Sequence, residues 1–312
     1  MPRRIILDCD TGRDDALAIA LACASPDEIE LLGVTTVAGN IPLELVHRNS
    51  RMILEVCGRP DIQVFAGSDR PLFRQHLWDE SSHGATGIAG VQIFEPKAAL
   101  ADGHAVDFII ATLRRSEPDT VDLVVTGPMT NIALVAMSAP DAFARIHEIV
   151  VMGGSSGPRG NMSAAAEFNI FVDAEAAARV LSSGRPITMF GLDVTYRVLA
   201  RPRHRAALER GGGCAGKFLA PLLSPLPEWS TERLGPEVIP LHDPCTIAWL
   251  IRPELFQMIA LNVEVETLSQ LTYGETVVDR WNYSGRRANV KWAIEVDGDD
   301  LIDLVVERLS KL

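Results

Sequence analysis

The residues that most plainly could do chemistry are four aspartates near the start of the chain. Asp8, Asp10, Asp14 and Asp15 lie within eight residues of one another in the stretch IILDCDTGRDDALAIALA. Four carboxylates this close repel one another unless a positive charge lies among them. A helix that begins here could use Asp14 and Asp15 to cap its free amides, but capping accounts for only one or two of the four.

Carboxylates in this number indicate a site for a hard divalent cation, Ca²⁺ or Mg²⁺, because no His or Cys spacing of the zinc type accompanies them. The stretch is not an EF-hand loop: the twelfth position counted from Asp8 is Ile19, where that loop needs a glutamate. A haloacid-dehalogenase-type phosphatase is an alternative, since it also places Asp-x-Asp after its first strand. Its pattern ends in Gly-Thr, whereas Thr11 and Gly12 stand here in the opposite order.

The aspartates follow the first of several apolar, β-rich runs that alternate with helix-like segments. The expected strands cover residues 4–7, 29–38, 61–66, 121–125, 147–152 and 186–192. The expected helices cover residues 14–25, 49–58, 105–116 and 174–184, and two of them end in a glycine that suits a left-handed cap. This alternation predicts an α/β fold with an open, mainly parallel sheet flanked by helices.

The part of the chain after about Pro202 is rich in glycine and proline. We expect irregular helices and a loop there, before strand-like patterns return at residues 262–268, 275–279 and 289–296. A second loop-rich segment covers residues 72–90. Such loops beyond strand ends commonly cover ligands in α/β proteins. No Ser/Gly linker interrupts the chain, so we expect a single domain, residues 1–312, with a loop-rich carboxyl-terminal part.

The composition excludes several partner classes. With 29 Lys and Arg against 41 Asp and Glu, the net charge is −12, which repels phosphate backbones and anionic lipid. The longest apolar run, residues 16–24, is far short of the roughly 20 residues of a membrane span. The start lacks the apolar stretch of a signal peptide, and five scattered cysteines favour a reducing compartment. We therefore expect a cytoplasmic protein that binds neither nucleic acid nor membrane.

The segment DCDTGRDDA resembles the opening signature of the inosine-uridine-preferring nucleoside hydrolase family, Asp-x-Asp-Pro-Gly-x-Asp-Asp-Ala, with Thr11 in place of proline. The resemblance continues in order through TTVAGN, RPDIQVFAGSDRPL, HGATGIAG, VTGPMTNIAL, VVMGGSSGPRGNMSAAAEFNIFVDAEAA and PLHDPCTIAWL, and so spans nearly the whole chain. It implies a nucleoside hydrolase-like fold, hydrolysis of the N-glycosidic bond of ribonucleosides to free base and ribose, and a homo-oligomer, either a tetramer or a dimer.

The resemblance also implies a Ca²⁺ ion held by Asp10, Asp15, the backbone carbonyl of Thr126 and Asp243. These ligands leave room, in a shell of about six to eight oxygens, for a water and two ribose hydroxyls. Asp243 by itself, directly before Pro244, would be typical of a turn. Asp10 is the expected general base for the Ca²⁺-bound water, and the alternative is that it serves as a ligand alone.

The expected contacts to the substrate follow from the same resemblance. The ribose-binding residues are Asp14, Asn40, Asn161, Glu167 and Asn169, with Met152 beneath the sugar. On its own, the stretch GNMSAAAEFN is more typical of a loop with capping asparagines. His242, beside the carboxylate of Asp243, is expected to be held protonated and to donate to the departing base. His83 matches a position near the base, with its role open.

The implied reaction passes through an oxocarbenium-like ribosyl group that the water captures, as in inverting glycoside chemistry. An aromatic residue could stack on the departing base; the candidates, by position only, are Trp78, Trp229, Tyr273, Trp281 and Tyr283. A metal-dependent phosphatase and a catalytically silent nucleoside-binding module are the alternative functions. The sequence leaves the preference for purine or pyrimidine nucleosides open.

Overall fold

The computed structural model describes residues 1–78, 83–157, 160–224 and 237–312. Its centre is a nine-stranded sheet with the strand order β10-β9-β11-β6-β5-β4-β1-β2-β3. The strands are β1 (Arg3–Cys9), β2 (Ile29–Thr36), β3 (Val64–Ala66), β4 (Val121–Val125), β5 (Ile146–Met152), β6 (Ile187–Phe190), β9 (Phe256–Val265), β10 (Thr276–Asp279) and β11 (Val290–Val296). Strands β7 (Leu199–Ala200) and β8 (Ile239–Pro240) form a separate antiparallel pair.

The central sheet is mainly parallel, which confirms the expected fold class. Strands β3, β2, β1, β4, β5, β6 and β11 run parallel to one another, whereas β9 is antiparallel to both of its neighbours, β11 and β10. All the runs expected to be strands form strands. The late pattern at residues 289–296 becomes β11 and extends the parallel part, and the other two late patterns form its antiparallel edge.

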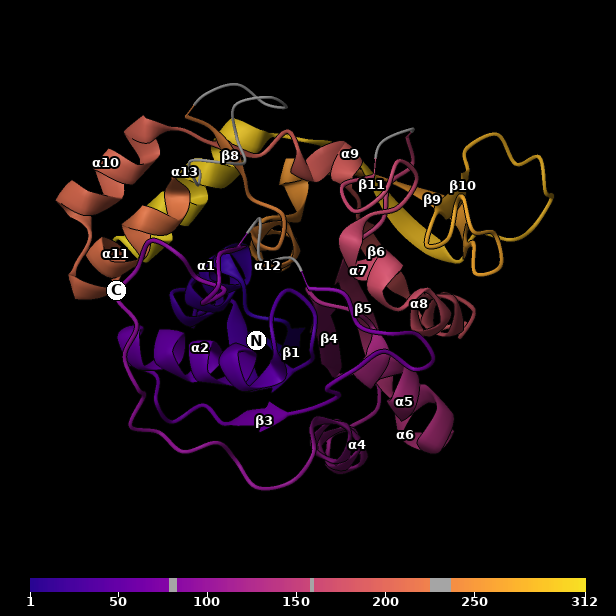
Figure 1. Cartoon of the computed structure of the whole chain (residues 1–312), viewed down its shortest axis with the longest axis horizontal. Helices are drawn as coiled ribbons and strands as arrows, with labels where there is room; N and C mark the ends of the chain where they lie inside the picture. The colour runs from indigo at the N-terminus through magenta and orange to yellow at the C-terminus, as the bar shows by residue number, and fades with distance from the viewer. Residues whose placement is uncertain (79–82, 158–159, 225–236) are drawn as a thin grey trace.

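Helices cover both faces of the sheet (Figure 1). On one face lie α1 (Arg13–Cys23), α2 (Leu43–Val56), α10 (Pro202–Gly211), α11 (Cys214–Leu219), α12 (Pro244–Ile251) and α13 (Gly298–Leu309), and on the other α4 (Ala105–Arg115), α5 (Thr130–Ser138) and α8 (Ala174–Leu181). Shorter segments are α6 (Pro140–Phe143), α7 (Phe168–Val172), α9 (Leu192–Thr195), η1 (Ala220–Leu223) and η2 (Pro253–Leu255). The four expected helices correspond to α1, α2, α4 and α8, and Gly58 after α2 has the positive φ (71°) of a left-handed cap.

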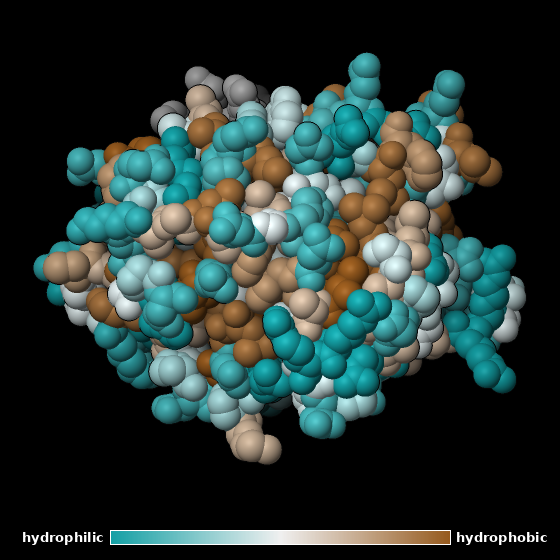
Figure 2. Space-filling view, turned by 90° about the horizontal axis from the view of Figure 1, so that it is seen from below, coloured by the Kyte–Doolittle hydropathy of each residue, from teal (hydrophilic) through white to brown (hydrophobic). Residues whose placement is uncertain are grey.

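The core has two parts because the sheet has two apolar faces. Ile5 and Leu7 of β1 pack into the cluster beneath α1 and α2, and Ile6 between them packs into the cluster beneath α4 and α5. Alternation of this kind is the expected result when successive side chains of a strand point to opposite faces. The surface on the side of β3 and α4 is mixed, with hydrophobic side chains exposed between hydrophilic ones (Figure 2).

The parallel strands bring several expected site residues to one edge of the sheet. Asp10 follows β1, Asn40 follows β2 by a short loop, Thr126 follows β4, and Met152 ends β5. Since these four strands run in the same direction, their carboxyl ends meet at the same edge, where open α/β sheets bind ligands. No helix among the described residues is both long and apolar enough to span a bilayer.

Candidate active site

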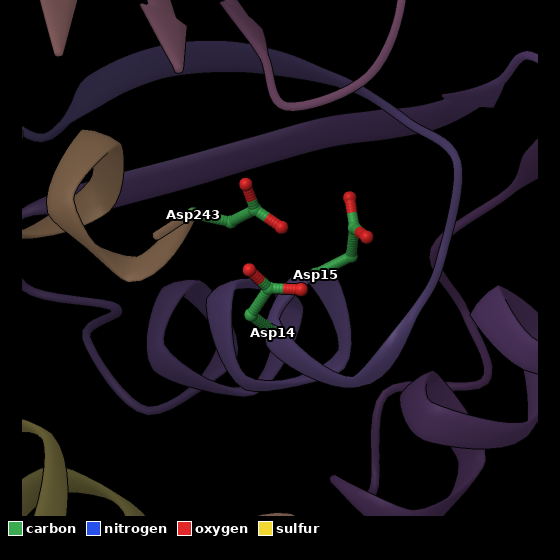
Figure 3. A group of neighbouring side chains, drawn as sticks. All are labelled: Asp14, Asp15 and Asp243. Atoms are coloured by element: carbon green, nitrogen blue, oxygen red, sulfur yellow. The ribbon is translucent and has the colours of Figure 1, made fainter. Parts of the chain in front are cut away.

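Two adjacent aspartates and a third that lies far from them in the sequence come together beside this edge of the sheet. Asp14 and Asp15 lie in the first turn of α1, and Asp243 directly precedes α12. Their carboxylate groups point toward one another (Figure 3), and one oxygen of each lies within 4.8 Å of the others. Asp15 and Asp243 are buried, and Asp14 is partly exposed. The packing of α12 against α1 makes Asp243 part of the amino-terminal aspartate motif.

Asp10 lies next to this group but outside the 4.8 Å cluster. Its Oδ2 accepts a hydrogen bond from the backbone N–H of Asn40 (2.7 Å), and its Oδ1 is buried without a hydrogen-bond partner among the residues that the structure describes. The loops after β2 and β4 approach Asp10 closely at glycines: a Cβ atom at Gly39 would overlap Oδ2, and one at Gly127 would lie 2.9 Å from Oδ1. Asp10 is therefore held in a narrow space with one oxygen fixed and one unpaired.

Asp10, Asp15 and Asp243 share an environment that penalises negative charge. Burial, reinforced by the charge of Asp14, raises the pKa of Asp15 to about 7. Burial and the neighbouring carboxylates raise the pKa of Asp243 and of Asp10 well above the usual range. A divalent cation would offset this penalty, and a set of carboxylate oxygens without His or Cys suits a hard cation. The residues present therefore fit a bound metal ion.

Asp15 also has the structural role that the sequence allowed. Its Oδ2 accepts a hydrogen bond from the backbone N–H of Gly12 (2.8 Å) at the start of α1, and its Oδ1 accepts one from the hydroxyl of Thr126 (2.8 Å). Capping thus explains one of the four aspartates. Asp8 is explained separately, because Oδ1 of this buried side chain accepts hydrogen bonds from Thr35 and Asn131 (2.6 and 2.8 Å) away from the cluster.

The start of α7 supplies a second polar wall. Asn169 donates its Nδ2 to the carbonyl of Thr126 (2.8 Å) and to that of Met152 (3.2 Å), and so joins the ends of β4 and β5. Glu167 caps α7 by accepting from the N–H groups of Asn169 and Ile170, and it also accepts from Gly154. Burial raises the pKa of Glu167 to about 7. The loop was expected to cap with asparagines; the N-cap is instead Glu167, and Asn161 accepts from the N–H of Phe168 (2.8 Å). These bonds fix polar side chains beside the aspartates.

One pocket brings most of the expected residues together. It is lined by Asp14, Asn40, His83, Thr126, Met152, Asn161, Glu167, Asn169, His242 and Asp243. Asp10 and Asp15 are not in its lining, but they are hydrogen-bonded to Asn40 and Thr126, which are. The pocket therefore lies over the aspartate cluster and contains both of the histidines that the sequence singled out.

His242 is held by two successive residues at the end of α9. Its Nδ1 forms a hydrogen bond with the hydroxyl of Thr195 (2.7 Å), and the ring of Tyr196 meets it edge to face, with 5.2 Å between the centroids. Burial lowers the pKa of His242, and the charge of Asp14 opposes this shift only in part. The direction is opposite to the protonated ring expected from the sequence, because the loss of water outweighs the attraction of the nearby carboxylate.

The pocket also contains residues that sequence reasoning missed, among them Leu17, Phe168, Leu222, residues 239–241 and, most notably, Arg13. Arg13 is 3% exposed, and its guanidinium donates to the carbonyls of Pro221 and Leu222 at the end of η1 (both 3.2 Å). Burial lowers the pKa of Arg13 to about 10. The sequence does carry a signal for Arg13. It is a basic residue directly before Asp14, among the clustered aspartates, and it lies one helical turn before Leu17.

The aromatic candidates lie elsewhere. Trp78 lies against His76 with the two rings tilted by 39°, the hydroxyl of Tyr273 donates to Glu175 (2.5 Å), and Trp281 and Tyr283 are exposed. None of these four lines the described part of the pocket. Trp229 lies outside the described residues. These candidates rested on position in the sequence, which carries no information about which aromatic ring lies beside His242; that ring belongs to Tyr196.

Thr11, which stands where the family signature has proline, is fully buried and makes a hydrogen bond of its own. Its hydroxyl lies 2.6 Å from the hydroxyl of Ser50 on α2 and 3.3 Å from the sulfur of Cys9. Proline has no hydroxyl and could not form these contacts. A hydrogen bond to Ser50 thus holds the turn between β1 and α1 against α2, whereas a proline ring at this position would restrict the backbone of the turn.

Comparison with known proteins agrees with this geometry. Residues 5–303 match the family model described as inosine-uridine preferring nucleoside hydrolase. The chain is 44% identical to an uncharacterized protein of Schizosaccharomyces pombe (99% of each chain) and 42% identical to the pyrimidine-specific ribonucleoside hydrolase RihA of Klebsiella pneumoniae (98% of each). A solved structure, the purine-preferring ribonucleoside hydrolase from Gardnerella vaginalis, superposes with a TM-score of 0.89 at 33% identity, covering 99% of this chain and 98% of that one. The chain therefore belongs to the inosine-uridine preferring nucleoside hydrolase family, and it is a glycosidase that hydrolyses the N-glycosidic bond of ribonucleosides.

Proposed function

We propose that the metal of this hydrolase is Ca²⁺, held by Asp10, Asp15, the carbonyl of Thr126 and Asp243. The support is the convergence of carboxylates whose pKa values are raised by burial and, to a smaller extent, by their mutual repulsion, together with Oδ1 of Asp10, which has no hydrogen-bond partner among the described residues. When bound, Ca²⁺ would lower the pKa of a nearby water and bind hydroxyl oxygens of the sugar. The partial exposure of Asp14, at the opening of the same cluster, suits a contact to the sugar.

Asp10 is our candidate for the general base. The observation that carries this assignment is its place beside Asp14 and Asp15, with Oδ2 accepting from Asn40 and Oδ1 without a hydrogen-bond partner in the described part of the chain. An oxygen in that position can take a proton from a water that attacks the anomeric carbon, while the first hydrogen bond holds the carboxylate in place. The same Oδ1 could also bind the metal, and one carboxylate can serve both purposes.

The ribose would lie against Asp14, Asn40, Asn161, Glu167 and Asn169, above Met152. Asn161 accepts from the N–H of Phe168 (2.8 Å), and Asn169 is bound to the strand ends, so both amides are fixed before substrate arrives. Fixed polar groups can bind the sugar hydroxyls without the cost of ordering flexible side chains. This would hold the anomeric carbon beside Asp10 and orient the base toward His83 and His242.

We propose that His242 assists the departure of the base by donating from Nε2 as a neutral imidazole. Its lowered pKa favours the neutral ring, and a neutral N–H donor can still stabilise charge that develops on the base. His83, whose Nδ1 accepts from the backbone N–H of Arg13 (3.1 Å), lies in the same pocket near the base.

Pyrimidine ribonucleosides are the proposed preferred substrates. The support is that the pyrimidine-specific hydrolase of Klebsiella pneumoniae is more similar to this chain than the purine-preferring one of Gardnerella vaginalis, at 42% against 33% identity. Release of free base and reducing sugar from uridine, cytidine, inosine and adenosine, assayed side by side, tests this, and we expect higher kcat/KM for the two pyrimidines. Higher values for inosine and adenosine would reverse the assignment.

The same assays separate the alternative functions. Tight binding without turnover would indicate a nucleoside-binding module, and phosphate release from a phosphoester would indicate a phosphatase.

We further propose that residues 1–312 act as one domain, within a cytoplasmic homo-oligomer, a tetramer or a dimer. The continuous nine-stranded sheet supports a single domain, and the five free cysteines suit a reducing compartment. Large apolar side chains exposed near β10, including Leu268, Leu271 and Trp281, are surface that association would cover. Light scattering coupled to gel filtration tests the oligomer, and a monomer at micromolar concentration would contradict it.

A further inference from the structure

The short helix α9 lies between the end of β6 and the pocket, and its last residue contacts His242. Thr195 is fully buried, and its hydroxyl oxygen lies 2.7 Å from Nδ1 of the histidine. Within the described part of the chain, the Thr195 hydroxyl has no other hydrogen-bond partner. Among the described residues, Nδ1 of His242 is therefore the atom that can accept the hydrogen of the Thr195 hydroxyl.

The direction of that hydrogen bond follows from burial. A hydroxyl carries one hydrogen, and a buried hydrogen without an acceptor costs about 1 to 3 kcal/mol. If Nδ1 of His242 were the donor, the hydrogen of the Thr195 hydroxyl would point into the interior with no acceptor among the described residues. If the hydroxyl donates to Nδ1, both groups are satisfied, and the proton of the neutral imidazole must then be on Nε2.

We propose that Thr195 is a positioning residue that sets the tautomer and the ring orientation of His242, so that the histidine presents an Nε2–H donor to the leaving base. This inference rests on the proposed role of His242 in the hydrolase reaction. Thr195 does not touch the substrate, because the pocket is lined by His242 and not by Thr195. Its effect on catalysis passes through the histidine alone.

The surroundings of α9 make it a rigid support. The carboxylate of Asp193 accepts from the backbone N–H of Ser156 (3.0 Å) and from the indole N–H of Trp292 (3.1 Å), and the N–H of Leu192 donates to the carbonyl of Gly154 (2.8 Å). These bonds tie α9 to the loop after β5 and to β11. Thr195 is thereby fixed on one side of the His242 ring, and Tyr196 meets the ring edge to face.

The direct test is the tautomer of His242, measured by ¹⁵N and ¹³C NMR of the histidine ring in the Ca²⁺-loaded enzyme at pH about 8. We expect the Nε2–H form in the wild type and in Thr195→Ser, which keeps the hydroxyl. We expect a shift toward the Nδ1–H form in Thr195→Val, which keeps the shape but loses the donor. An Nδ1–H tautomer in the wild type, or an unchanged tautomer in Thr195→Val, would overturn the proposal.

The kinetic test compares a natural nucleoside with a riboside whose leaving group departs as a stable anion. Loss of one hydrogen bond of ordinary strength corresponds to a decrease of roughly tenfold, and we expect that decrease in kcat for the nucleoside with Thr195→Val. The activated riboside should keep its rate, because its departure needs no donor. Equal losses on both substrates would mean that Thr195 only supports the fold, which contradicts a positioning role.

Thr188→Val is the matched control. Thr188 is also fully buried and also makes a short hydrogen bond, to Glu148 (2.6 Å), but it lies on β6 away from the pocket. Its replacement should lower stability without changing the ratio of the two rates. If the wild type hydrolysed no nucleoside, the proposed function would fail, whereas the NMR measurement would still decide whether Thr195 sets the tautomer.

Discussion

The backbone N–H of Asn40 donates to Oδ2 of Asp10 over 2.7 Å, and this bond joins the loops that follow β1 and β2. Oδ1 of Asp10 is buried, and no described residue forms a hydrogen bond with it. A carboxylate with one oxygen fixed and the other available suits a base that must be both placed and reactive. Much of the chemistry proposed for this hydrolase therefore depends on the second oxygen of Asp10.

Asp10→Asn should lower kcat by about 10² to 10⁴ with the fold intact, because a carboxamide cannot act as the base. Asp8→Asn is the matched control, since Asp8 is equally buried but bonds to Thr35 and Asn131 outside the pocket. We expect this control to retain most of its activity. Single-turnover rates and circular dichroism of both variants provide the measurement, and near-normal turnover of Asp10→Asn would move the base to another residue.

Removal of the metal should abolish turnover and lower the melting temperature. A ligand that binds only the folded state stabilises it by about 2.7 kcal/mol at a hundredfold excess over its Kd, and this contribution is lost in a chelator. Titration of Ca²⁺ back into the protein should restore both properties. A preparation shown to be metal-free by elemental analysis that kept full ribosidase activity would contradict the assignment.

The metal-free protein should lose stability as the pH rises from about 4 to about 7. Asp15 has a pKa of about 7 in the folded state, above the value of about 3.9 expected when unfolded, so the folded state binds more protons in this interval. Its favourable contribution is fully present below pH about 4 and is gone above pH about 7. Denaturant midpoints at pH 5 and pH 8, in chelator and in Ca²⁺, measure this. A midpoint in chelator that does not decrease with pH would show that Asp15 is ionised at low pH.

Nucleosides that lack the 2′-hydroxyl should be poor substrates. Their binding would leave the polar groups of the pocket that are assigned to the sugar, such as Asn169 and Glu167, and a position on the metal with one partner fewer. Sites built to bind a substrate hydroxyl reject the analogue without it by about 10⁴ or more. The comparison is kcat/KM for uridine against 2′-deoxyuridine, and equal values would show that the ribose contacts are wrongly assigned.

His242→Ala should slow the hydrolysis of natural nucleosides strongly, because the departing base loses its hydrogen-bond donor. The same change should barely affect a riboside with a leaving group that departs as a stable anion. The ratio of the two losses cancels general damage to the fold. If the ratio is near one, His242 acts only through its neighbour Asp243 or through the fold, and His83 becomes the candidate donor.

The sequence by itself determined the elements that local chemistry specifies. Apolar runs predict β1, β2, β4 and β5, and the polar residues that follow these runs, such as Asp10 and Thr126, are expected at one edge of a parallel sheet. This follows because parallel strands carry their carboxyl ends together. The aspartate motif is equally local, because Asp10, Asp14 and Asp15 lie within six residues at one turn, whereas Asp8 of the same stretch bonds to Thr35 and Asn131 away from the cluster.

The tertiary structure decided which distant residues meet. Asp243 belongs to the aspartate cluster only because α12 packs against α1, and by sequence it is an ordinary aspartate before proline. The contact of Thr195 with His242, and the lowered pKa of that histidine, depend on burial and on the position of α9, neither of which a local pattern records. Side chains that determine a tautomer or a pKa are neighbours in space, and neighbours in space are fixed by the order of strands and the packing of helices.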